Sequence, residues 1–263
     1  GVAAAAVVVA VISSVVLWRD ASSVDESRTM AYIGPPARKA ILEMADGGQH
    51  YLGGSGIKFE ERDGAQVAIS SGKVVYDKKS GEDAEEKEDV LVYNRITIPR
   101  GAGLYRISLN DGSVIWLNSD SRLEYPEKFA KGERRVRVTG EAFFGVARDT
   151  MRPFVVETAR QSVTVLGTEF NVSAYPSEPE MTTLASGRVK VVPAGSMEEV
   201  VLSPGEQSVL GTGINSLRVR QVKVSDVVSW KDGMINIENM ALSEILKVVS
   251  RAYDVDFVTE SLS

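Results

Sequence analysis

The pattern of apolar and polar positions along the chain is that of many short β-strands separated by turns. Between residues 40 and 222, apolar and polar residues alternate in short runs, which is the period of a strand with one buried face. Asp-Gly, Ser-Gly and Pro-Gly pairs between the runs favour tight turns. The runs predict strands at Ala40–Met44, Gln66–Ile69, Val74–Tyr76, Tyr105–Leu109, Val114–Leu117, Arg134–Val138, Phe154–Glu157, Ser162–Leu166, Thr168–Ala174, Arg188–Val192, Val200–Leu202, Gln207–Leu210 and Leu217–Val222. Their spacing predicts a mainly β domain over residues 38–225, an antiparallel β-sandwich or roll.

Part of this pattern repeats. Ile41–Gly53 and Ile107–Asn118 both contain an apolar run, an Asp-Gly pair and a second apolar run. Each therefore predicts a hairpin with a turn at the Asp-Gly pair. Glu61–Ile69 is a partial third copy. We expect a stack of hairpins in which each unit buries the apolar face of its neighbour.

The C-terminal segment, residues 226–263, has a different pattern. Met234–Ile237 predicts a short strand, and Asp254–Val258 predicts another. Between them, apolar residues recur at helical spacing behind Asn239, a candidate cap: Leu242, Ile245, Leu246, Val249 and Ala252. The segment thus predicts a small α/β domain, one β-α-β unit. One such unit cannot bury both of its faces, so we expect it to pack on the β domain or on a partner.

The N-terminal segment is apolar. From Val2 to Trp18 it carries no charge, and only Ser13 and Ser14 are polar. A spanning helix needs about 20 apolar residues, with a range of about 17–25. The terminal Trp18, followed by a charged pair, suits a membrane interface. Residues 1–19 therefore predict one transmembrane helix and residues 20–37 a linker, while a cleaved signal peptide and a buried core helix remain alternatives. Because the chain does not begin with methionine, we expect further sequence upstream.

The amino-acid composition excludes several kinds of functional site. The chain has no cysteine, which excludes disulfides, thiolate zinc sites and cysteine nucleophiles. His50 is the single histidine, which disfavours a Ser-His-Asp triad and multi-histidine metal sites. The 30 basic and 36 acidic residues give a net charge of −6, which argues against nucleic acid as the main partner. We expect no cofactor and no metal.

Five stretches follow one another along the chain: Pro99–Phe129, Arg137–Thr158, Val163–Pro176, Thr182–Val191 and Leu202–Gln207. Together they resemble the FecR family, anti-sigma-factor regulators of Gram-negative bacteria. Trp230–Phe257 resembles the C-terminal, secretin-like domain of the Bacteroidetes members. This resemblance implies an inner-membrane, single-pass protein with its bulk in the periplasm. Its implied partners are an outer-membrane TonB-dependent transducer, which binds through its N-terminal signalling domain, and an extracytoplasmic-function sigma factor, which binds the cytoplasmic segment missing from this chain.

Two sets of site residues follow. Gly167-Thr168 interrupts a run of β-formers, and two interpretations stay open. Gly167 permits a positive φ or a tight bend, after which Thr168 restarts the strand. Alternatively, the resemblance implies self-cleavage, in which the Thr168 hydroxyl attacks the preceding carbonyl. For the transducer, the candidate contacts are Ile237, Leu246 and Val249 in the C-terminal segment.

The resulting hypothesis is a membrane-anchored signal transducer that acts by protein binding and regulated proteolysis, and not an enzyme with turnover. A carbohydrate-active or carbohydrate-binding periplasmic β-sandwich is the alternative, and a scaffold module is a third reading. A glycosidase needs a second carboxylate facing the first across a cleft. The carboxylate of Glu141, amid apolar residues, is more typical of a surface or paired group.

Overall fold

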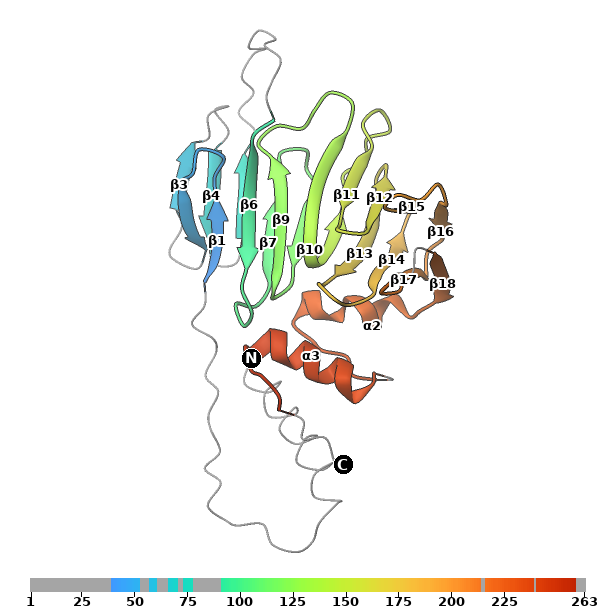
Figure 1. Cartoon of the computed structure of the whole chain (residues 1–263). Coiled ribbons are helices and arrows are strands. Elements are labelled where there is room, and N and C mark those ends of the chain that lie inside the picture. The colour runs from blue at the N-terminus through green and yellow to red at the C-terminus, as the bar shows by residue number, and fades with distance from the viewer. Residues whose placement is uncertain are drawn as a thin grey trace, which may run out of the picture. The chain divides into compact units, whose positions relative to one another are not determined.

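The computed structural model describes residues 39–52, 57–60, 66–70, 73–77, 91–213, 216–238 and 240–258 (Figure 1). Its strands are β1 (Ala40–Glu43), β2 (Gln49–Leu52), β3 (Ile57–Glu60), β4 (Gln66–Ser70), β5 (Lys73–Asp77), β6 (Tyr93–Ile98), β7 (Tyr105–Ser108), β8 (Val114–Leu117), β9 (Ser121–Pro126), β10 (Arg134–Gly145), β11 (Phe154–Glu157), β12 (Gln161–Val165), β13 (Glu169–Ala174), β14 (Glu180–Ser186), β15 (Val189–Pro193), β16 (Val200–Leu202), β17 (Glu206–Leu210) and β18 (Leu217–Gln221). Three short helical elements follow: α2 (Val224–Val228), the 3-10 helix η1 (Ser229–Asp232) and α3 (Leu242–Tyr253). The prediction of a mainly β protein is confirmed.

The strands form two sheets. The first has the order β2-β1-β6-β9-β10-β11-β12-β15-β16. The second has the order β3-β4-β5-β7-β8-β10-β13-β14-β17-β18. Neighbours are antiparallel except at β5/β7 and β10/β11, which are parallel. The expectation of purely antiparallel sheets is therefore wrong at these two pairs.

Strand β10 belongs to both sheets and explains one of the parallel pairs. Its first half pairs with β9 in the first sheet, and its second half pairs with β8 in the second. The crossing lies at Gly140, whose φ is +90° and where a Cβ would lie 2.4 Å from the Ser121 hydroxyl oxygen. Because β10 leaves the first sheet there, the chain must return to it, and β11 enters alongside the first half of β10 in the same direction.

The hydrophobic core lies between the sheets. Fully buried side chains come from both, among them Ile96, Leu123 and Val156 from the first sheet and Phe144 and Phe170 from the second half of β10 and from β13. Phe144 and Phe170 stack with their ring centroids 5.0 Å apart. This shared core gives the two-layer packing of a β-sandwich.

The predicted hairpin repeat is confirmed where it can be seen. Strands β1–β2 and β7–β8 are antiparallel hairpins. Their turns hold Gly47 and Gly112, with φ of +89° and +85°. Strands β3 and β4 also pair, but the turn of this third copy lies outside the described residues.

The predicted β-α-β unit is only partly correct. Helix α3 is present, but Met234–Ile237 and Asp254–Val258 do not form strands. The second segment is held by Arg100 instead of by a strand ladder, because the Arg100 guanidinium donates to the Val255 carbonyl at 2.8 Å. The Glu244 carboxylate accepts from the Ala241 backbone N–H at 3.0 Å at the start of the helix. Asn239, the predicted cap, lies outside the described residues.

The apolar segment 1–19 and the linker 20–37 also lie outside the described residues. Among the residues that the structure does describe, no helix is long and apolar enough to cross a membrane.

Candidate functional site

Gly167-Thr168 lies at a corner where the chain changes sheets. Strand β12 ends at Val165 in the first sheet, and β13 begins at Glu169 in the second. The φ of Gly167 is +153°, and a Cβ at this position would lie 2.7 Å from the Arg148 Cα. The predicted positive φ is confirmed, and the close approach of a second backbone explains why glycine occupies the bend.

Residues 146–149 fix the backbone of the Gly167-Thr168 corner through two hydrogen bonds. The Asp149 N–H donates to the Leu166 carbonyl at 2.8 Å, and the Val146 N–H donates to the Thr168 carbonyl at 3.0 Å. These two bonds flank the Gly167-Thr168 peptide on either side. The peptide therefore has little freedom to rotate.

The Thr168 side chain points to the other side of the corner. It is buried, and its hydroxyl donates to the Arg188 carbonyl at 3.0 Å. Gly187, with φ of +92°, lies against the same hydroxyl. The corner is thus enclosed by residues 146–149 on one side and by the turn at residues 186–188 on the other.

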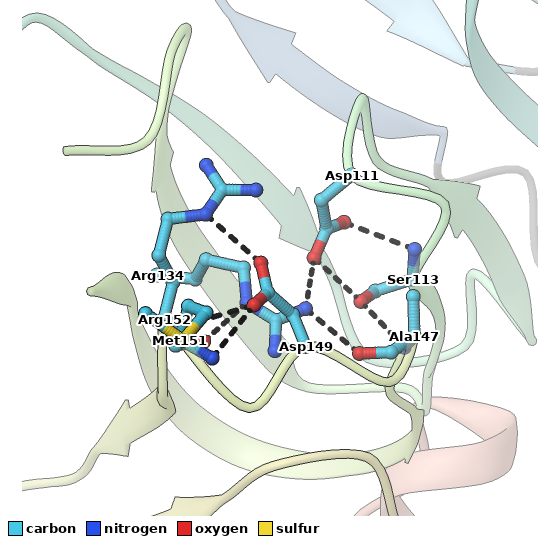
Figure 2. Close-up of polar contacts among 7 residues, drawn as sticks. All are labelled: Asp111, Ser113, Arg134, Ala147, Asp149, Met151 and Arg152. Carbon is cyan, nitrogen blue, oxygen red and sulfur yellow. Dashed lines mark hydrogen bonds and ion pairs between the residues drawn. The ribbon is translucent and has the colours of Figure 1, made fainter. Parts of the chain in front are cut away.

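Arg134 holds the loop after β10, which lies on the Arg148 side of the Gly167-Thr168 corner (Figure 2). Its side chain is 1% exposed and forms an ion pair with Asp111 at 2.8 Å. Its guanidinium also donates to the carbonyls of Ala147 at 2.9 Å and Arg152 at 3.0 Å. The Asp111 carboxylate accepts in turn from the N–H and the hydroxyl of Ser113. Arg134 therefore ties the β7–β8 hairpin to the loop after β10.

A pocket of about 410 Å³ opens beside this loop. It is lined by Asp111, Arg134, Ala147, Arg148, Asp149, Thr150 and Arg152. Both carboxylates in its wall are already paired with arginines, Asp111 with Arg134 and Asp149 with Arg152. The hydrogen bond from Arg152 holds the pKa of Asp149 below its ordinary range. In the part of the chain that the structure describes, no group of three or more acidic or histidine side chains is placed to hold a metal ion.

The three predicted contact residues in the C-terminal segment differ in exposure. Val249 is 6% exposed, whereas Ile237 and Leu246 are half-buried. The exposed apolar side chains of this segment are others: Met234, Leu242, Phe257 and Val258. Leu242 belongs to the apolar set that the helical periodicity selected, yet its side chain is exposed at the start of α3.

A chain of hydrogen bonds links the C-terminal segment to the sandwich. The Trp230 indole N–H donates to the Asn171 carbonyl oxygen at 3.2 Å, and the Asn171 amide donates to Glu141 at 3.0 Å. Asn118 donates to the other Glu141 oxygen at 2.8 Å. Burial raises the pKa of Glu141. Glu141 is thus a paired carboxylate, as predicted, while Trp230 and Asn171 were missed because their partners are distant in sequence.

Helix α3 makes a second attachment through Arg251. Its guanidinium lies over the Tyr175 ring, 3.8 Å from the ring centroid. It also forms an ion pair with Glu178 at 2.7 Å. Together with the contacts of Arg100, these interactions fix the helix against the loops at one end of the sheets, where Figure 1 shows α2 and α3.

Comparison with known proteins gives a consistent result. A family model described as FecR protein matches residues 100–190. Two crystal structures of a "putative anti-sigma factor" from Parabacteroides distasonis ATCC 8503, at 2.50 Å and 1.65 Å resolution, are each 30% identical to the chain. The first alignment covers 62% of this chain and 76% of the other with a TM-score of 0.58, and the second covers 61% and 74% with a TM-score of 0.57. No curated protein matches the chain. On the family match and the likeness over three quarters of a solved relative, the chain belongs to the FecR family.

Proposed function

We propose that this chain is an anti-sigma regulator that relays a signal from an outer-membrane TonB-dependent transducer to an extracytoplasmic-function sigma factor. The observation that carries the proposal is the 30% identity over 76% of a structure described as a "putative anti-sigma factor". Residues 1–19 anchor the chain in the inner membrane, and the sandwich and C-terminal segment lie in the periplasm. The sigma factor binds a cytoplasmic segment upstream of residue 1.

The transducer binds the C-terminal segment. Two features support this assignment: the segment attaches to the sandwich mainly through polar contacts, and it exposes large apolar side chains. Leu242 is 64% exposed on the first turn of α3. An amphipathic helix with free apolar positions suits recognition by a hydrophobic groove.

A pull-down with the transducer's N-terminal signalling domain tests this assignment. We expect Leu242→Asp to weaken capture and deletion of Trp230–Ser263 to abolish it, with the β domain still folded. Met197→Asp is the matched control, because Met197 is a fully exposed apolar residue in the loop before β16. Full capture by the deletion variant would place the receptor surface in the sandwich and refute the assignment.

The proteolytic step begins with self-cleavage at Gly167-Thr168. The Thr168 hydroxyl oxygen bonds to the Gly167 carbonyl carbon, the peptide C–N bond breaks, and the hydroxyl proton passes to the Thr168 nitrogen. Water then hydrolyses the ester, leaving a Gly167 carboxylate and a free Thr168 amine. The fixed peptide and the buried hydroxyl of the corner support this step, since reacting groups held in place lose less entropy.

Purified protein tests the cleavage directly. We expect two fragments on a denaturing gel, one band for Thr168→Ala, and faster cleavage with hydroxylamine, which traps the ester. Thr168→Ser keeps the hydroxyl and retains some cleavage. A wild-type chain that stays intact with and without hydroxylamine would remove this step and leave Gly167 as a bend only.

A further inference from the structure

The turn at residues 186–188 lies beside the Thr168 hydroxyl. Strand β14 ends at Ser186, and β15 begins at Val189, so Gly187 and Arg188 form the turn between them. The ladder between β13 and β14 shifts register at Glu169/Phe170, next to the corner. Beside this irregularity, the turn lies against the Gly167-Thr168 peptide.

Gly187 lies against both atoms that would react. A Cβ built on Gly187 would be 2.8 Å from the Thr168 hydroxyl oxygen and 3.2 Å from the Gly167 carbonyl oxygen. In the proposed cleavage, the first oxygen attacks and the second takes up the negative charge. Both oxygens must shift as the carbonyl carbon becomes tetrahedral, and only glycine leaves the space beside them free.

The neighbouring carbonyl orients the nucleophile. The Thr168 hydroxyl is buried and donates a hydrogen bond to the Arg188 carbonyl at 3.0 Å. A hydroxyl that donates there keeps its lone pairs free for the Gly167 carbon. The hydrogen bond also fixes the side-chain rotamer, which a free threonine would lose by rotation about χ1.

We infer that the 186–188 turn is the positioning element of the Gly167-Thr168 cleavage. The Arg188 carbonyl holds the attacking hydroxyl, and Gly187 supplies the space in which the tetrahedral carbon forms. This inference rests on the self-cleavage proposed above. It adds that residues some twenty positions downstream set the cleavage rate through backbone atoms.

Gly187→Ala is the direct test. The new methyl group would have to move the Thr168 hydroxyl by about 0.6 Å to restore an ordinary contact of 3.4 Å. A misplacement of about 1 Å costs about 100-fold in rate, so we expect cleavage to slow by about 10- to 100-fold. Hydroxylamine should not restore the rate, because the ester itself forms slowly.

A matched variant separates this role from general strain. Gly47→Ala introduces the same methyl at a similar φ of +89°, with nothing within 4 Å, and should leave cleavage unchanged. If Gly187→Ala does not fold, replacing Val189 with its α-hydroxy acid turns the Arg188 amide carbonyl into a weaker ester acceptor. That variant should cleave several-fold more slowly.

The outcomes are distinct. A wild-type chain that never cleaves overturns both this inference and the self-cleavage. A wild type that cleaves, with folded Gly187→Ala or the ester variant cleaving equally fast, overturns the positioning role alone.

Discussion

Removal of the Arg134 side chain is the most direct test of the packing around the corner. Arg134→Met keeps most of the volume and the apolar contact but leaves the Asp111 carboxylate, 4% exposed, without its cation. It also removes the donors to the Ala147 and Arg152 carbonyls. Breaking a buried ion pair by deleting one partner costs about 3–5 kcal/mol, which is the expected loss in the free energy of unfolding.

The assay is thermal and urea unfolding of the purified domain. For a domain of this size, about 1 kcal/mol corresponds to about 2–4 °C in Tm, so Arg134→Met should lower Tm by about 6–20 °C. Arg137→Met is the matched control in the same strand, because its ion pair with Glu157 is exposed and should contribute less than about 1 kcal/mol.

A double-mutant cycle sharpens the test. Asp111→Asn combined with Arg134→Met leaves no unpaired buried charge, so the two losses should not add, and a coupling of about 1–3 kcal/mol is expected. The reasoning is refuted if Arg134→Met costs no more than Arg137→Met. In that case water or a local rearrangement would already compensate Asp111.

Three further predictions concern other parts of the chain. Burial raises the pKa of Glu180 above its ordinary value of 4.5, so the folded chain binds this proton more tightly than the unfolded chain, and stability is lost as the pH rises above about 4.5. The Tm of Glu180→Gln relative to wild type should therefore increase between pH 4.5 and 7.5, and a constant difference would contradict this. Arg251→Ala removes the stacking on Tyr175 and the pair with Glu178, so hydrogen exchange in α3 should accelerate while the strands stay protected; equal protection of α3 in both proteins would be inconsistent with this attachment. The full-length protein should stay in the membrane fraction after a carbonate wash, with residues from Arg19 onward open to protease in spheroplasts, and soluble recovery with a new N-terminus would indicate a cleaved signal instead.

Strands made of short apolar runs could be predicted from the sequence almost to the residue. β8, β11 and β16 have the predicted bounds, because their buried positions are occupied by apolar residues. β6 and β14 were missed because polar residues stand at their buried positions. Asn94 in β6 is fully buried and accepts from the Ala45 N–H. Thr182 in β14 is fully buried and accepts from the Gln161 amide.

For the candidate site, the sequence allowed only the bend at Gly167 to be predicted. The bend at Gly167 could be inferred because glycine interrupts a β run, and the φ confirms it. The hydrogen-bond partners around the corner could not be inferred, because the pairs Thr168–Arg188 and Asp111–Arg134 join residues that are 20 and 23 positions apart. Such pairs depend on strand register and on the crossing of β10, which a one-dimensional pattern does not contain.

The corner between β12 and β13 has a mechanical consequence. Among the described strands, only two ladders join those before Gly167 to those after it: β10 with β13, and β12 with β15. While the peptide bond is intact, tension between the two ends of the domain is borne by a covalent chain. If the proposed self-cleavage cuts the bond, the same tension is borne by these two ladders and by side-chain packing. A cut domain would keep its resting structure and yet separate under a pull that the uncut domain withstands.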